Sequence, residues 1–149
     1  MASVEIRAVD HNDFDRWLPL WLGYQRFYEV EIPQSAGLKT WARFLDPVEP
    51  VHAALALVDG RALGLAQWIY HRSTWAIDDY CYLQDLFVSD DARGNGLGRA
   101  LIELVAEEAT RNGSPRLYWS THESNRTAIQ LYDGIAERSG FVIYRKPLV

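Results

Sequence analysis

The sequence is short of cysteine, of positive charge and of long apolar runs, and each shortage excludes a class of protein. Cys81 is the only cysteine among 149 residues, so no internal disulfide forms, and no Cys and His cluster predicts a zinc site. Fifteen Lys and Arg against 20 Asp and Glu give a net charge of -5, which argues against a nucleic-acid-binding surface. The amino-terminal segment 1–13 has no apolar core of signal-peptide length, and no run approaches the ~18 apolar residues of a membrane span. We expect a cytoplasmic protein with no metal, nucleic-acid or membrane partner.

Composition and organisation indicate a single domain over residues 1–149. The chain has a mass of 17.1 kDa and is 48% hydrophobic, which is enough to bury a core. It has no internal repeat and no linker rich in proline, glycine or serine.

Apolar periodicity predicts a mixed α/β fold. Spacing of three and four residues predicts four helices, at 14–28, 38–45, 97–112 and from a cap at Ser124 or Asn125 to Ser139-Gly140. Apolar runs predict six strands, at 4–9, 51–58, 61–70, 80–88, 116–120 and 141–144. Asp59-Gly60 favours a type I′ hairpin between two of them. The order is an antiparallel meander followed by a strand-helix-strand-helix-strand half.

The segment Arg93-Gly94-Asn95-Gly96-Leu97-Gly98 carries the clearest chemical signal. Three glycines in five residues let the backbone bend tightly and bring its N–H groups close to an anion. The helix that follows directs the positive end of its dipole at the same place, and Arg93 adds a charge. The segment therefore predicts a phosphate-binding loop.

Spacing separates three kinds of phosphate loop. A nucleotide P-loop needs Lys and Ser or Thr after the last glycine, whereas Gly98 is followed by Arg99-Ala100. A dinucleotide loop needs its third glycine at Arg99 and an acidic residue near Ser120, and neither is present. The placement of Arg93, Gly96 and Gly98 after an antiparallel meander resembles the pyrophosphate loop of the GNAT superfamily of N-acetyltransferases.

The resemblance runs from about residue 80 to 148. The segment YLQDLFVSDDARGNGLGRALIE is similar to the family's cofactor strand, loop and helix, and NRTAIQLY is similar to its second signature. Within the superfamily, the chain is most similar to the small-amine branch that includes Hpa-type histone and polyamine acetyltransferases. The resemblance implies acetyl-CoA as cofactor and a GNAT fold, in which helices flank a mixed sheet with an antiparallel meander and a splayed parallel strand pair.

The resemblance also implies which residues bind acetyl-CoA. The pantetheine arm is expected along the strand edge, and the pyrophosphate on the amides of the glycine loop. The implied contacts come from the strand, the loop and the second signature helix: Leu86, Phe87 and Val88; Arg93, Gly94, Asn95, Gly96, Leu97, Gly98 and Arg99; and Asn125, Ala128 and Tyr132.

Tyr132 matches the family tyrosine that can protonate the leaving thiolate as a general acid. Asn125 lies seven residues earlier, which is two helical turns, so both side chains share one helix side. The backbone N–H of Val88 is implied to polarise the thioester carbonyl. Seven residues separate Tyr132 from Gly140-Phe141 where common relatives have about three, and the four extra residues are expected to add one turn to the helix.

The base that deprotonates the amine is harder to assign. An amine of pKa ~10 is neutral only about one time in a thousand at pH 7, so a base is needed. Polyamine-type relatives often have glutamate at the position of Gln84, and an amide cannot accept the proton. Asp85 is a candidate to help deprotonate the amine. In an ideal strand Asp85 points to the face opposite Gln84, and a bulge near the cofactor could change the face that Asp85 occupies. Carboxylates that could act through water are Asp78, Asp79, Glu29 and Glu31.

The acceptor pocket is expected where acidic and aromatic side chains gather, since both suit an ammonium group. The candidates are Tyr28, Glu29, Glu31, Trp68 and Asp79, with Trp75 and Asp78 nearby, whereas Trp17, Trp21 and Trp41 are expected in the core. A polyamine-like or amino-acid-like small amine is favoured over a lysine or amino-terminal peptide, and an aminoglycoside comes third. A CoA-binding sensor without turnover is the alternative from another class, supported by Gln84. Dimers are common in the family, so a homodimer is also considered.

Overall fold

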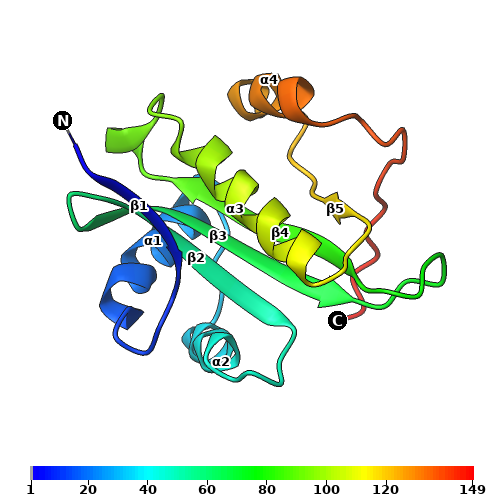
Figure 1. Ribbon diagram of the computed structural model, residues 1–149, viewed down its shortest axis with the longest axis horizontal. Helices are drawn as coiled ribbons and strands as arrows, with labels where there is room; N and C mark the ends of the chain where they lie inside the picture. Colours follow the sequence, from blue (N-terminus) through cyan, green and yellow to red (C-terminus); the bar gives the residue numbers. More distant parts are fainter. Residues whose placement is uncertain (1) are drawn as a thin grey trace. The chain divides into compact units, whose positions relative to one another are not determined.

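A computed structural model describes residues 2–149, which form two compact units, one ending at Trp119 and one from Ser120 to Val149. The first unit has a five-stranded sheet in the order β1-β2-β3-β4-β5, three helices and one 3-10 turn (Figure 1). Its strands are β1 Val4–Ala8, β2 Val51–Val58, β3 Arg61–His71, β4 Tyr80–Val88 and β5 Leu117–Tyr118. Its helical elements are α1 Phe14–Phe27, α2 Gln34–Phe44, η1 Asp90–Ala92 and α3 Leu97–Arg111, and the second unit contains α4 Arg126–Ile135.

Pairing in the sheet is antiparallel from β1 to β4 and parallel between β4 and β5. The parallel pair is short, because only Cys81 and Tyr82 of β4 have partners on β5, namely Leu117 and Tyr118. Residues 83–88 of β4 extend beyond the last partner on β5. The predicted mixed sheet, with an antiparallel meander and a parallel pair, is confirmed.

The hairpin between β2 and β3 turns at the predicted pair. Asp59 and Gly60 have φ values of 51° and 81°, the left-handed conformation that a type I′ turn requires at both positions. Asp59 also accepts a hydrogen bond from the Ser3 N–H at 2.8 Å, which ties the turn to the start of β1.

Helices cover both faces of the sheet in the first unit. Figure 1 shows α1 and α2 on one face and α3 on the other. The α1 and α2 face is filled by Trp17, Trp21 and Trp41, which are 0%, 7% and 9% exposed and pack against apolar residues of β2 and β3. This confirms that the three tryptophans are core residues. On the opposite face α3 approaches closely, because a Cβ at Gly64 would lie 3.0 Å from the Leu101 side chain.

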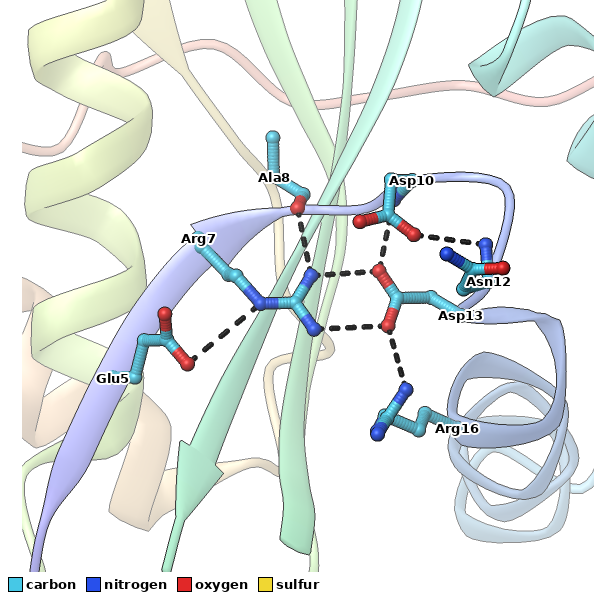
Figure 2. A network of polar contacts seen from close by, with 7 residues as sticks. All are labelled: Glu5, Arg7, Ala8, Asp10, Asn12, Asp13 and Arg16. Atoms are coloured by element: carbon cyan, nitrogen blue, oxygen red, sulfur yellow. Dashed lines mark hydrogen bonds and ion pairs between the residues drawn. The ribbon is translucent and has the colours of Figure 1, made fainter. Parts of the chain in front are cut away.

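An ion-pair network joins β1 to the start of α1 (Figure 2). The Arg7 guanidinium donates two hydrogen bonds to the Asp13 carboxylate, at 2.6 and 2.9 Å, and Arg16 adds a third at 3.2 Å. The Asp10 N–H also donates to Asp13 at 2.8 Å. Asp13 is fully buried, and the Arg7 hydrogen bonds lower its pKa to about 2.

The second unit departs from two predictions. The helix was expected to continue to Ser139-Gly140, but α4 ends at Ile135, and Ala136 is already extended with φ of -150°. The extra residues before Gly140 therefore add no helical turn; instead Arg138 folds back onto Asp133, with contacts of 3.1 and 2.9 Å.

The final predicted strand is also absent from the described residues. Residues 141–144 pair with no strand, and their side chains are 74–93% exposed. A strand needs a neighbouring backbone to pair with, whereas here the Phe141 N–H donates to the Ser139 hydroxyl at 3.1 Å.

Candidate functional site

The outer edge of β4 presents unpaired backbone groups close to the glycine loop. The Ser89 N–H donates to the Leu63 carbonyl at 2.8 Å, on the β3 side. Because antiparallel neighbours alternate, the backbone groups of Phe87 point toward β3 and those of Leu86 and Val88 point away from it. Within residues 2–149, no strand pairs with β4 on that outer side beyond Tyr82. The Leu86 backbone and the Val88 N–H can therefore bind an extended ligand as an added strand would bind, whereas the Val88 carbonyl accepts a hydrogen bond from Arg93 and the groups of Phe87 are directed to β3.

The glycine loop connects this edge to α3. Gly94 and Gly96 have φ values of 86° and 76°, and Gly96 occupies the N-cap position of the helix. A Cβ at either glycine would meet nothing within 4 Å, so the loop surface is open. The first helical hydrogen bond runs from the Ala100 N–H to the Gly96 carbonyl, so the amides of 97–99 are left for another acceptor. The 15-residue helix α3 directs its positive dipole end to this loop, which fits a diphosphate.

Arg93 is held beside the end of β4. Its Nε donates to the Val88 carbonyl at 3.1 Å, its guanidinium pairs with Asp90 at 3.0 Å, and its Cζ lies 4.9 Å from the centre of the Phe27 ring. Arg93 also lines an open groove of about 710 Å³ between α1 and the end of β4, together with Arg26 and Arg61. The arginine is thus fixed on the strand side of the loop, where the groove also contains Asp90 and Asp91, which pair with Arg93 and Arg61.

A bulge in β4 determines where Asp85 points. Gln67 pairs with Asp85 and Trp68 pairs with Leu83, so Gln84 has no partner on β3. Gln67 and Trp68 are consecutive residues of β3, so their side chains point to opposite faces of the sheet. Their partners Asp85 and Leu83 therefore also point to opposite faces. In an ideal strand, residues two apart such as Leu83 and Asp85 would share one face. Asp85 faces α1, whereas the Gln84 side chain is exposed.

Asp85 is 9% exposed and is surrounded by neutral hydrogen-bond donors. The Gln67 side-chain amide donates to it at 2.7 Å, and Gln67 in turn accepts a hydrogen bond from the Trp17 indole at 2.7 Å. The Tyr24 hydroxyl also lies on the Asp85 side of α1, where it can act as a second donor to the carboxylate. Burial raises the pKa of Asp85 despite both donors, and burial raises the pKa of Tyr24 far above its ordinary value.

The segment between α1 and α2 contains three predicted acceptor residues, of which Tyr28 packs against Tyr24. The Tyr28 ring lies 4.8 Å from the Tyr24 ring, and the exposed Glu29 and Glu31 follow it. Gln25 orders the segment, because its side-chain carbonyl accepts the Ile32 N–H at 2.9 Å and its backbone carbonyl accepts the Val30 N–H at 2.9 Å. Glu29 has a φ of 54°, which is rare for a residue other than glycine and costs conformational energy. The tight turn at Glu29 thus sets the position of both glutamates.

The other two predicted acceptor residues, Trp68 and Asp79, lie away from Asp85. Trp68 points to the face opposite Asp85 and lines a pocket of about 150 Å³ with His52 and with Leu104 of α3. Asp79 precedes β4 at the end far from the glycine loop, where it pairs with Arg72 at 3.3 Å. The structure therefore does not bring these two predicted acceptor residues to Asp85.

In the second unit, the predicted cofactor residues share one face of α4. Asn125, Ala128 and Tyr132 are all half-buried, whereas Arg126 and Thr127 between them are exposed. Asn125 occupies the N-cap position, but its amide donates to Thr121 at 3.3 Å and makes no capping bond. The expected helix side common to Asn125 and Tyr132 is thus confirmed within this unit.

Two polar residues of the Asp85 network were not identified from the sequence. Gln67 carried a detectable signal, since it is a lone amide in the apolar run from Leu63 to Tyr70. Tyr24 was assigned only to an aromatic helix face, and its hydroxyl contact depends on the packing of α1 against β4.

Comparisons with known proteins agree with this geometry. A model of the Acetyltransferase (GNAT) family matches residues 14–135. The chain is 34% identical to D-amino-acid N-acetyltransferase HPA3 of Saccharomyces cerevisiae, over 96% of this chain and 90% of that protein. It is 31% identical to thialysine N-epsilon-acetyltransferase of Caenorhabditis elegans, over 91% and 83% of the two chains.

Solved structures show the same fold. AAC(6')-Iy in complex with a bisubstrate analog superimposes with a TM-score of 0.85 over 99% of both chains, at 19% identity. A probable acetyltransferase superimposes with a TM-score of 0.84 over 97% of this chain and 98% of the other, at 24% identity. No helix among residues 2–149 is long and apolar enough to cross a membrane. The free strand edge, the glycine loop and these matches agree, and the chain belongs to the GNAT acetyltransferase family as an acetyl-CoA-dependent N-acetyltransferase.

Proposed function

We propose that this protein transfers an acetyl group directly from acetyl-CoA to the primary amine of a small cationic or amino-acid-like acceptor, with Tyr132 as general acid. The observation that carries the proposal is the strand edge formed by the Leu86 backbone and the Val88 N–H, which no other strand covers and which leads into the left-handed glycines at the start of α3. One edge and one helix terminus together fit a ligand with an extended amide arm and a diphosphate.

The named relatives support the acceptor class. HPA3 is named for acetylation of D-amino acids, and the nematode relative is named for thialysine. Both names describe small molecules with a primary amine. The acidic and aromatic segment at Tyr28, Glu29 and Glu31 offers the charge that such an acceptor needs.

Each proposed cofactor residue has a physical task. Bound acetyl-CoA supplies the acetyl group as a thioester. The Val88 N–H donates to the acetyl carbonyl oxygen and stabilises the negative charge that develops there. In the first unit, the amides of the glycine loop would hold the pyrophosphate and the Leu86 backbone would hold the pantetheine arm. In the second unit, Asn125 and Ala128 are the residues that we propose for contact with the cofactor.

Protons move at two places in the proposed reaction. The Tyr132 hydroxyl donates one to the departing sulfur. On the acceptor side Asp85 is the carboxylate that takes up the amine's proton, since the exposed Gln84 amide has no basic site.

The proposal is tested by CoA release from acetyl-CoA with a panel of amines: D-amino acids, thialysine, polyamines, an aminoglycoside and a lysine peptide. Tyr132→Phe keeps the ring and removes the proton donor, so kcat should fall about 100-fold or more. Tyr144→Phe is the matched control, because Tyr144 is 93% exposed, and it should keep wild-type kcat. Wild-type turnover by Tyr132→Phe would rule out the general acid, and turnover of only the peptide would rule out the small-molecule acceptor.

We also propose that the protein is cytoplasmic, has a single domain and forms a homodimer. The lone Cys81 is buried and burial raises its thiol pKa to about 12, which suits a protein without disulfides. The exposed apolar run Phe141–Tyr144 offers surface that a second copy can cover. Light scattering coupled to gel filtration measures the mass, and a monomer at all concentrations would contradict the dimer.

A further inference from the structure

A chain of hydrogen bonds leads from the core to Asp85, and Tyr24 lies beyond Asp85 toward the surface. The chain of hydrogen bonds begins at the Trp17 indole, which is 0% exposed, passes through Gln67 at 4% and reaches Asp85 at 9%. Tyr24 follows and is only half-buried. A ligand can thus touch this network through Tyr24, not through its buried members.

The direction of each hydrogen bond is determined by chemistry. An indole N–H can only donate, so the Gln67 atom that faces Trp17 is its carbonyl oxygen. The NH₂ group of Gln67 must then face Asp85, which accepts it. Trp17 thereby prevents the amide from flipping and keeps Gln67 a donor to the carboxylate.

Asp85 has no cation beside it in the part of the chain that the structure describes. The groups that face it are Gln67 from β3 and Tyr24 from α1, and the Tyr24 hydroxyl is itself near Tyr28 and Tyr82. None of these carries a positive charge. A buried carboxylate supported only by neutral donors is a strong proton acceptor, because burial favours its neutral form.

We propose that Tyr24 relays the proton of the acceptor amine to Asp85, and that Gln67, oriented by Trp17, is the positioning residue that keeps Asp85 ready to accept it. This inference rests on the proposed acetyl transfer to an amine. The ammonium gives a proton to the Tyr24 oxygen while the Tyr24 hydroxyl gives its own proton to Asp85. One N–H and one O–H bond break, two O–H bonds form, and the amine is left neutral and nucleophilic.

The relay explains why Tyr24 does not need to ionise. Burial and the nearby carboxylate raise the pKa of Tyr24, so its phenolate is inaccessible and the hydroxyl can only pass a proton on. The relay also provides a base for the acceptor amine, since the Gln84 amide cannot accept a proton.

The first test compares two pH titrations in wild type and Gln67→Met. The first titration follows the acidic limb of kcat/KM against pH. The second follows the carboxyl ¹³C chemical shift of Asp85 against pH, with the signal assigned by means of Asp85→Asn. Loss of the Gln67 donor should move both midpoints to higher pH by the same amount, with kcat/KM recovering above the limb. Gln67→Glu should move them in the same direction, because a second carboxylate disfavours the charged form of Asp85.

Gln34→Met is the control, since Gln34 is exposed on α2, and it should change neither midpoint. An unchanged Asp85 midpoint in folded Gln67→Met would overturn the role of Gln67. A shifted carboxyl midpoint with an unshifted kcat/KM limb would overturn Asp85 as the proton acceptor.

Tyr24→Phe tests the relay itself. It keeps the ring that packs between Trp21 and Tyr28 at centroid distances of 5.3 and 4.8 Å, and it removes the hydroxyl. We expect kcat/KM to fall about 100-fold on the pH plateau, while CoA binding is unchanged. Wild-type kcat/KM in this variant would overturn the relay and leave acetyl transfer intact, whereas no turnover of any amine by wild type would overturn the proposed function itself.

Discussion

At the scale of single residues, two buried carboxylates show opposite behaviour because their partners differ. Asp13 accepts hydrogen bonds from the Arg7 and Arg16 guanidinium groups, and its pKa is lowered. Asp85 accepts from neutral donors alone, and burial raises its pKa. A charged aspartate therefore contributes to the stability of the fold at position 13 and lowers that stability at position 85.

Asp13→Asn should destabilise the protein at neutral pH. A native pKa of about 2 against an ordinary 3.8 means that the Asp13 carboxylate contributes stability above pH 3.8 and loses it as pH falls through 2. The shift corresponds to about 2 kcal/mol at pH 7. Urea unfolding at pH 7 should show this loss, and the gap from wild type should close near pH 2. A constant gap across that range would contradict the ion-pair explanation.

Asp85→Asn should have the opposite sign. Because the native pKa of Asp85 is raised, the residue favours the folded state at low pH and loses that contribution as pH rises through the native pKa. The amide carries no charge to bury, so the variant should gain in unfolding free energy relative to wild type as pH increases, while losing activity. A wild type that stays the more stable protein at pH 8 would show that Asp85 is not held as an unpaired buried charge.

At the scale of elements, a glycine of the β2–β3 hairpin can serve as the control for a glycine of the glycine loop. Gly96 and Gly60 both have left-handed φ, at 76° and 81°, and a Cβ meets no atom at either. Alanine should therefore cost each about 1–2 kcal/mol of stability from backbone strain alone. Only Gly96→Ala should also weaken CoA binding, measured by calorimetry, because only that loop presents amides to a phosphate. Equal CoA affinity in the two variants would remove the loop from the binding site.

At the same scale, local sequence predicted the elements well where turns and caps decide them. The bounds of β4, the start of α3 and the hairpin at Asp59-Gly60 depend on neighbouring residues and were confirmed. The bulge at Gln84 was not predictable, because it is defined by the register against Gln67 and Trp68 on another strand. That register, and not the alternation within β4, directs Asp85 toward α1.

At the scale of the whole molecule, CoA should stabilise the fold measurably. Ligand at ~100 times its dissociation constant contributes about 2.7 kcal/mol. For a chain of this size that corresponds to a rise in melting temperature of about 5–10 °C. Differential scanning fluorimetry should show the rise in wild type and a smaller one in Arg93→Ala, since Arg93 supports the strand end beside the loop. An unchanged melting temperature at saturating CoA would count against the whole site.

The sequence by itself determined the chemistry of the donor side. Glycine spacing, the arginine before it and the helix after it are local features, so the pyrophosphate loop could be recognised without coordinates. The tertiary structure alone decided the network that we propose for the acceptor side, where Trp17, Gln67, Asp85 and Tyr24 come from one helix and two strands. Hydrogen bonds between distant segments depend on register and helix packing, and these are properties of the folded chain that no local pattern encodes.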